Sequence, residues 1–156
     1  GASAGAIKQM QALVNASPKN AYFHEMLGQM YFETGNPKAA LGPLKRAVSL
    51  KPKQPEIRLI YALALIDTNN KNNIDEAIAQ LKRIAATSPD SARPHAVLAR
   101  AYAKLGDIGQ ADLAAAEAAL IRGDIKLARG LAKKAQQKLK KGTPAWLRSD
   151  DILSLT

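Results

Sequence analysis

The 156-residue sequence contains no cysteine, which excludes disulfide bonds and thiol chemistry. Aromatic residues make up only 4% of it and runs of β-branched residues are missing, so little favours a β-sheet. No apolar run approaches the roughly 20 residues that a membrane-spanning helix requires. A signal peptide is also missing, from which we expect either a cytosolic protein or a mature segment of a longer one.

Alanine, leucine and lysine dominate the composition, and these residues favour helices. The formal net charge of +10 favours acidic partners, although charge alone indicates association rather than a specific activity. A chain of this length can form one domain that buries about 70% of the surface exposed by the unfolded chain. Composition therefore predicts a basic, all-α domain.

Residues 20–52 carry a pattern that the rest of the chain repeats. The pattern consists of a first helix, a glycine turn, a second helix and a closing proline, with key positions His24, Leu27, Gly28, Tyr31, Gly35, Ala40, Leu44, Ala47 and Pro52. It matches the tetratricopeptide consensus, except that His24 replaces a tryptophan and Leu44 a phenylalanine. The segment therefore resembles a tetratricopeptide (TPR) repeat. Gly28 is expected to let a neighbouring helix approach closely.

The resemblance implies an all-α, right-handed superhelix of antiparallel helix pairs, formed by a single TPR-like domain over residues 1–156. Full repeats are expected at 20–52, 54–89 and 91–122. Residues 1–17 match the second helix of a truncated repeat, so we expect a fragment of a larger protein. Further predictions are a degenerate overlapping repeat at 109–140 and a capping helix at 143–155. The end of the stack would be covered by Trp146, Leu147, Ile152 and Leu153 of that helix. The insertion at 69–73 is expected to form a surface turn.

Histidines raise the question of a metal site. His24 begins a match to the helical zinc motif H-E-x-x-H, but Gly28 stands where the second histidine is required. We interpret His24 and His95 as partly buried packing residues. No Ser-His-Asp set, phosphate-binding glycine loop or metal cluster is recognisable. The sequence predicts a chain that is not an enzyme and has no catalytic, cofactor or metal site of its own.

A basic run extends from Lys126 to Lys141. Nucleic-acid binding would require stacking aromatics or a recognition helix beside these charges, and neither is visible, so a nucleic-acid partner is not expected. The run is interpreted as a solvated helix face. Contact with an acidic protein or an anionic membrane surface remains as the alternative.

Successive first helices of TPR proteins line a groove that binds an extended segment or a helix. Transferring that geometry by offset predicts a partner-binding groove of Tyr22, Glu25, Gln29, Phe32, Glu56, Leu59, Leu63, Ile66, Arg93, Ala96, Arg100 and Lys104. The groove would be acidic at one end, apolar in the middle and basic at the other. Alternatively, its apolar residues pack on another domain of the parent protein. The chaperone-tail clamp of some TPR proteins is not expected, because it needs lysine and asparagine in place of Glu25 and Gln29.

The C-terminal third carries a more specific pattern. It consists of Ala116–Asp124, Ala128 and the run Gly142-Thr143-Pro144-Ala145-Trp146-Leu147-Arg148-Ser149-Asp150-Asp151-Ile152. This pattern resembles the C-terminal repeat domain of bacterial periplasmic zinc metallopeptidases of the BepA-like type.

That resemblance implies a periplasmic parent, with zinc in an upstream H-E-x-x-H protease domain of a metalloendopeptidase. This chain would then bind substrates or partner proteins, or pack on the protease domain. The alternative is a stand-alone TPR scaffold or assembly protein without a protease, with the cytoplasm as the alternative compartment.

Overall fold

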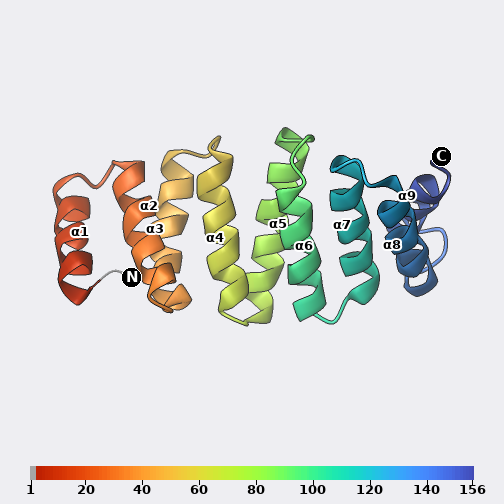
Figure 1. Ribbon diagram of the computed structural model, residues 1–156. Helices are drawn as coiled ribbons and strands as arrows, with labels where there is room; N and C mark the ends of the chain where they lie inside the picture. Colours follow the sequence, from red (N-terminus) through yellow and green to blue (C-terminus); the bar gives the residue numbers. More distant parts are fainter. Residues whose placement is uncertain (1–2) are drawn as a thin grey trace. The chain divides into compact units, whose positions relative to one another are not determined.

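The computed structural model describes residues 3–156, and its regular elements in this range are all α-helices (Figure 1). They are α1 (Ala4–Ala16), α2 (Ala21–Glu33), α3 (Pro37–Leu50), α4 (Pro55–Asp67), α5 (Lys71–Thr87), α6 (Arg93–Lys104), α7 (Ile108–Ile121), α8 (Ile125–Lys138) and α9 (Pro144–Leu153). The chain divides into two compact units, Gly1–Gln80 and Leu81–Thr156, and the division falls within α5.

The first unit is built from neighbouring helices that pack on one another: α1 on α2, α2 on α3 and α3 on α4, with α2 also reaching α4. A cluster of Met10, Val14 and Leu27 holds α1 against α2. Gly28 and Leu44 mark the close crossing of α2 and α3, because a Cβ atom on Gly28 would lie 2.5 Å from Leu44 Cγ. The expected close approach at Gly28 is present.

The turns between α2 and α3, α4 and α5, α6 and α7, and α7 and α8 each contain three residues. The middle residue has a positive φ in every case: Gly35, Asn69, Gly106 and Gly123. The residue that follows caps the next helix, as when Asp124 Oδ1 accepts a hydrogen bond of 3.1 Å from the Leu127 amide. A residue in the left-handed conformation ends one helix, and the side chain of the next residue accepts a hydrogen bond from the first turn of the following helix. The chain therefore reverses direction within three residues.

The prediction that the insertion at 69–73 forms a surface turn is correct for Asn69 and Asn70, which are exposed, and wrong for residues 71–73, which begin α5. Asn69 takes the left-handed conformation (φ 54°), and Asn70 Oδ1 accepts a hydrogen bond of 3.0 Å from the Asn73 amide. These asparagines therefore build the same three-residue turn that glycine builds elsewhere. The three inserted residues lengthen the helix, since α5 has 17 residues whereas α3 has 14.

The second unit packs α6 on α7, α7 on α8 and α8 on α9. Its core joins α7, α8 and α9, and consists of Leu113, Ala116, Ala119, Ala128, Ala132, Ala135 and Ile152. Helix α7 also contacts α9, as α2 contacts α4 in the first unit. Small alanines allow this close packing, because a helix that meets neighbours on several sides has little room for longer side chains.

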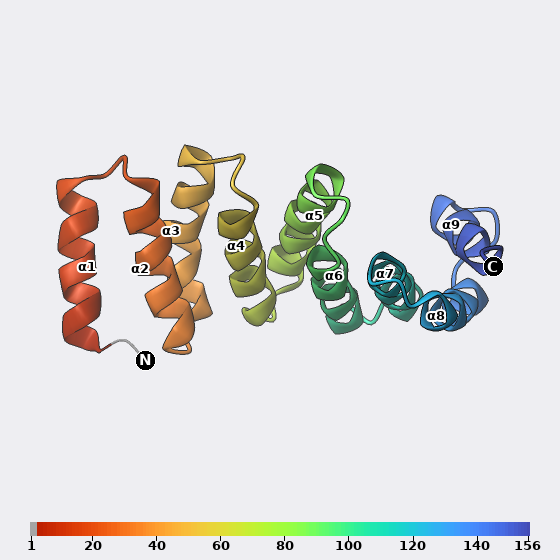
Figure 2. The ribbon, with the colours of Figure 1, turned by 45° about the horizontal axis from the view of Figure 1, so that its top comes forward.

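Helix α9 lies beside α8 at the C-terminal end (Figure 2). Ile152 and Ser149 are fully buried, and Ser149 Oγ donates a hydrogen bond of 2.6 Å to the Trp146 carbonyl. Arg148 pairs with Glu117 of α7 at 2.8 Å. Leu147, by contrast, is 51% exposed, so the expectation that it covers the end of the stack is wrong. Ile152 and Ser149 through their burial, and Arg148 through its ion pair with Glu117, thus help to hold α9 in place.

Candidate protein-binding surface

Helices α2 and α4 of the first unit contact each other and carry eight of the predicted groove residues. On α2, Tyr22 is 53% exposed, whereas Glu25 and Phe32 are half-buried. Gln29 is exposed, and its amide donates a hydrogen bond of 3.0 Å to Glu33. These side chains occur at intervals of three, four and three residues, which places them along one face of the helix. We call the surface formed by these four residues together with Glu56, Leu59 and Leu63 of α4 the α2/α4 face.

The pKa of Glu25 depends on its environment, which includes Glu56, the acidic residue in the first turn of α4. Partial burial raises the pKa of the Glu25 carboxyl, and the negative charge of Glu56 raises it further. Two carboxylates that repel each other attract a cation, because a positive group beside them relieves the repulsion. The α2/α4 face therefore has an acidic end suited to a lysine or arginine side chain.

The α4 part of this face is apolar. Leu59 and Leu63 are half-buried and lie about one helical turn apart, on the same side of α4. Ile66, in contrast, is fully buried, so its assignment to the partner-binding groove is wrong. Seven residues of α4 are buried, and this helix is apolar on most of its circumference. Sequence offset alone could not separate the side chains that face a core from those that face solvent.

The remaining predicted groove residues lie on α6 in the second unit. Arg93, Arg100 and Lys104 are exposed. Their spacing of seven and four residues places them on one face of α6, with Ala96 half-buried on the same helix. The second unit therefore presents a basic stripe on α6, whereas the first presents the acidic and apolar α2/α4 face.

Comparison with known proteins identifies the family to which this repeat pattern belongs. A family model described as the cytochrome c-type biogenesis protein H TPR domain matches residues 10–120. The chain belongs to this TPR family. The predicted all-α TPR fold is confirmed, and TPR domains act as protein-binding modules that are generally non-catalytic.

Solved structures share the fold of this TPR domain. A crystal structure of MamA is 24% identical with a TM-score of 0.70, and the match covers 95% of this chain and 82% of that one. A second MamA structure is 25% identical, with a TM-score of 0.69 and coverage of 97% and 86%. The TPR protein TTC0263 from Thermus thermophilus is 20% identical, with a TM-score of 0.55 and coverage of 96% and 90%. No curated protein matches the chain.

The TPR domain also contains a buried polar cluster that the sequence did not reveal. Arg58 is 8% exposed, and its guanidinium donates hydrogen bonds to the Gln80 side chain and, at 2.6 Å, to the Pro52 carbonyl. Tyr61 is buried one turn further along α4 and is hydrogen-bonded to Glu76 of α5. The only signal in the sequence was a charged residue within an otherwise apolar helix. We infer that this cluster aligns α4 with the adjacent part of α5.

Tyr61 provides a prediction for alkaline pH. Burial, the negative charge of Glu76 and the hydrogen bond to it raise the pKa of Tyr61 to about 12. The unfolded-state pKa is about 10, so the folded state holds this proton more tightly, and stability is lost as pH rises from 10 towards 12. An alkaline absorbance titration should show one of the four tyrosines ionising late, and Tyr61→Phe should remove that late step. A late step that survives in Tyr61→Phe would contradict the assignment.

Both histidines of the TPR domain lie in packing positions. His24 is 9% exposed, and its Nε2 lies 2.7 Å from the Pro18 carbonyl oxygen, so this nitrogen carries the proton. His95 is half-buried, and burial lowers its pKa; the nearby Arg148 also lowers it, whereas Glu117 raises it. Among residues 3–156, no group of three or more histidine, cysteine or acidic side chains could hold a metal ion. No helix in this range has both the length and the apolar character needed to cross a membrane.

Proposed function

We propose that this TPR domain is a non-catalytic protein-interaction module that binds a segment of a partner protein on its α2/α4 face. The main support is the combination on neighbouring helices of an exposed tyrosine, two interacting carboxylates and two half-buried leucines: Tyr22, Glu25, Glu56, Leu59 and Leu63. Apolar anchors supply affinity in such grooves, and flanking charges orient the ligand and speed its association.

The ligand best suited to this face has aliphatic anchors next to a lysine or arginine. A cation beside Glu25 would lower the carboxyl pKa that Glu56 and burial have raised, so binding is coupled to loss of a proton. Affinity should therefore increase as pH rises through the pKa of Glu25 and level off above it. High salt should weaken the charge contribution, since these groups are partly exposed.

Replacing Leu63 with aspartate is expected to weaken binding at least about tenfold, which corresponds to about 1.4 kcal/mol. The substitution replaces an apolar anchor with a carboxylate that an aliphatic side chain of the ligand cannot pair with, while the half-buried position allows the fold to persist. The probe is a set of fluorescent peptides in which aliphatic residues flank either one lysine or one glutamate. Fluorescence anisotropy should show that the lysine peptides bind more tightly.

Tyr22→Ala serves as a second variant, because the side chain is 53% exposed and its removal leaves the core intact. Leu147→Asp is the matched control, since Leu147 is similarly exposed but lies on α9. Unchanged affinity in folded Leu63→Asp and Tyr22→Ala would remove the α2/α4 face from the proposal. Equal affinity for lysine and glutamate peptides would remove the acidic end from it.

For the complete protein, we propose two settings. In the first, this domain binds substrates or partners for a periplasmic zinc metalloendopeptidase, whose upstream domain would hold the zinc and could itself pack on the TPR domain. In the second, it is a stand-alone scaffold or assembly protein with no protease. The family match favours the second setting, because its description refers to biogenesis of cytochrome c and not to proteolysis.

The two settings are distinguished by measurements on the complete protein. Zinc content and cleavage of an unfolded substrate should be measured with and without residues 1–156. Zinc-dependent cleavage whose rate or substrate preference changes on deletion would establish a targeting domain of a protease. If the complete protein binds no zinc and cleaves no substrate, the stand-alone scaffold is the setting that remains.

A further inference from the structure

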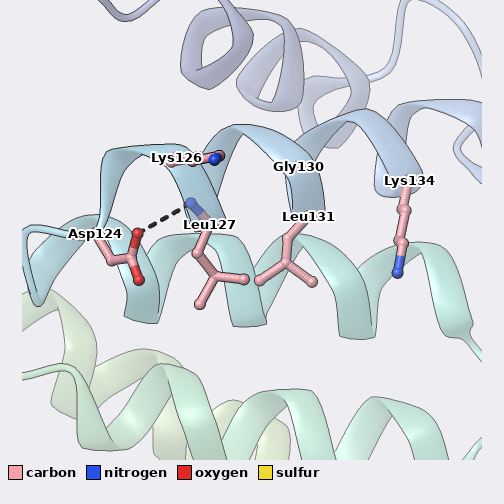
Figure 3. Close-up of a pocket in the computed structure, with 6 residues that line it drawn as sticks. All are labelled: Asp124, Lys126, Leu127, Gly130, Leu131 and Lys134. Carbon is pink, nitrogen blue, oxygen red and sulfur yellow. Dashed lines mark hydrogen bonds between the residues drawn. The ribbon is translucent and has the colours of Figure 1, made fainter.

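Helix α8 presents an apolar strip on the surface of the second unit. Leu127 is 51% exposed and Leu131 is half-buried, and the two side chains point to the same side of the helix, together with Lys134 (Figure 3). They border a depression of about 420 Å³, which is also lined by Asp124, Lys126 and Gly130. Its volume is sufficient for a large aliphatic side chain.

Gly130 keeps this depression open. A Cβ atom at this position would meet no other atom within 4 Å, so packing does not require glycine there. Glycine inside a helix is destabilising relative to other residues, because it loses more conformational freedom on folding. In α8 the glycine leaves space beside the exposed leucine and thereby widens the depression.

The surroundings of the strip are strongly basic. Lys126, Arg129, Lys133 and Lys134 are exposed, and none of them takes part in an ion pair within the described part of the chain. A second depression, of about 610 Å³, lies along Lys126, Arg129 and Lys133 and reaches Leu153 of α9. The carboxylate of Asp124 is occupied as the cap of α8, at 3.1 Å from the Leu127 amide.

We propose that this surface, which we call the α8 site (Lys126, Leu127, Gly130, Leu131 and Lys134), binds an acidic amphipathic helix of another protein. A leucine-sized anchor of that helix enters the depression beside Leu127, and glutamate or aspartate side chains on either side meet Lys126 and Lys134. Charge complementarity identifies the ligand class, because the net charge around an apolar anchor site selects ligands of opposite sign.

An anionic membrane surface fits the α8 site less well. Helices that bind membranes insert a broad, protruding apolar face containing several large side chains. Here the apolar strip has one strongly exposed leucine next to a hollow, which suits a single inserted side chain. The α8 site lies in the second unit and favours acidic ligands, whereas the α2/α4 face lies in the first unit and favours basic ones, so either proposal can fail without the other.

The probe is a fluorescent helical peptide of about 15 residues made of glutamate, alanine and leucine, with leucines every three or four positions so that they share one face. Its comparison probes are a peptide of the same composition in scrambled order and phosphatidylserine-containing vesicles. We expect the amphipathic peptide to bind with micromolar affinity, with weaker binding at high salt. The scrambled peptide should bind at least about tenfold more weakly, because it cannot combine the anchor with the charges.

Leu127→Asp and the double variant Lys126→Glu/Lys134→Glu should each weaken binding about tenfold or more. Gly130→Gln should also weaken it by filling the depression, while raising the melting temperature, so lost binding cannot be attributed to unfolding. Leu147→Asp is the control and should bind normally, since Leu147 is exposed to the same degree, 51%, on α9. Unchanged affinity in Leu127→Asp and Gly130→Gln, equal binding of the scrambled peptide, or binding to vesicles without binding to the peptide would each overturn the proposal.

Discussion

Leu44→Ala is expected to lower the free energy of unfolding of the first unit by about 2–5 kcal/mol. Leu44 is fully buried between α2 and α3, where its Cγ and Cδ2 atoms lie against Gly28. Removing these atoms loses the transfer free energy of a leucine side chain and leaves a cavity. Since the backbones of α2 and α3 already cross closely at Gly28, they cannot move together to fill it. Amide hydrogen exchange of α2 and α3 measures the loss locally. Leu13→Ala is the control, since Leu13 is 47% exposed on α1 and its removal should cost no more than about 0.5 kcal/mol.

The contact with Gly28 makes this prediction sharper. Gly28→Ala alone should destabilise by about 1–3 kcal/mol, because the new methyl group overlaps Leu44. In the Leu44→Ala background the overlapping atoms are gone, so the same substitution should cost nothing or stabilise α2 by up to about 1 kcal/mol through higher helix propensity. The two effects are therefore strongly non-additive. Additive effects in the double variant would contradict the close crossing.

Sequence patterns identified the helix pairs because their signals are local. The small and apolar positions of α3, such as Ala40 and Leu44, follow the helical period and are buried as that period predicts. Three of the turns contain a glycine, which is the residue that most readily adopts a positive φ. The fourth turn was predicted too long, because Asn69 and Asn70 complete it within three residues, whereas an asparagine-rich insertion is equally compatible with a longer loop.

The binding surfaces were less predictable, because exposure depends on neighbours that a single helix does not reveal. Leu63 and Ile66 are three residues apart and equally apolar, yet one is half-buried and the other fully buried. The α8 site was overlooked for a similar reason. The basic run there was visible, but the outward direction of Leu127 and the space beside Gly130 become apparent only from packing. A sequence shows where the charges occur, but it does not show the shape of an anchor site.

Ile152→Ala is expected to destabilise the second unit by about 2–5 kcal/mol and to release α9 from it. Ile152 is fully buried and packs in the core cluster with alanines of α7 and α8. A helix of ten residues is not stable in isolation, so α9 depends on this contact. The single tryptophan, Trp146, lies on α9, and its fluorescence during urea unfolding reports the release directly. Ile152→Ala should shift that transition to lower urea concentrations, so that Trp146 reports the release of α9 before the rest of the second unit unfolds.

Two control variants separate the contribution of this apolar contact from that of the neighbouring exposed groups on α9. Leu147→Ala removes a leucine that is 51% exposed on the same helix and should change stability by no more than about 0.5 kcal/mol. Arg148→Ala breaks the ion pair with Glu117. The Arg148 side chain is 45% exposed, so water screens the pair and the substitution should lower the free energy of unfolding by less than about 1 kcal/mol. If Arg148→Ala proved as damaging as Ile152→Ala, charge rather than burial would hold α9. The burial of Ile152 and the exposure of the ion pair favour the opposite order, in which the core contact secures α9 and the ion pair only orients it.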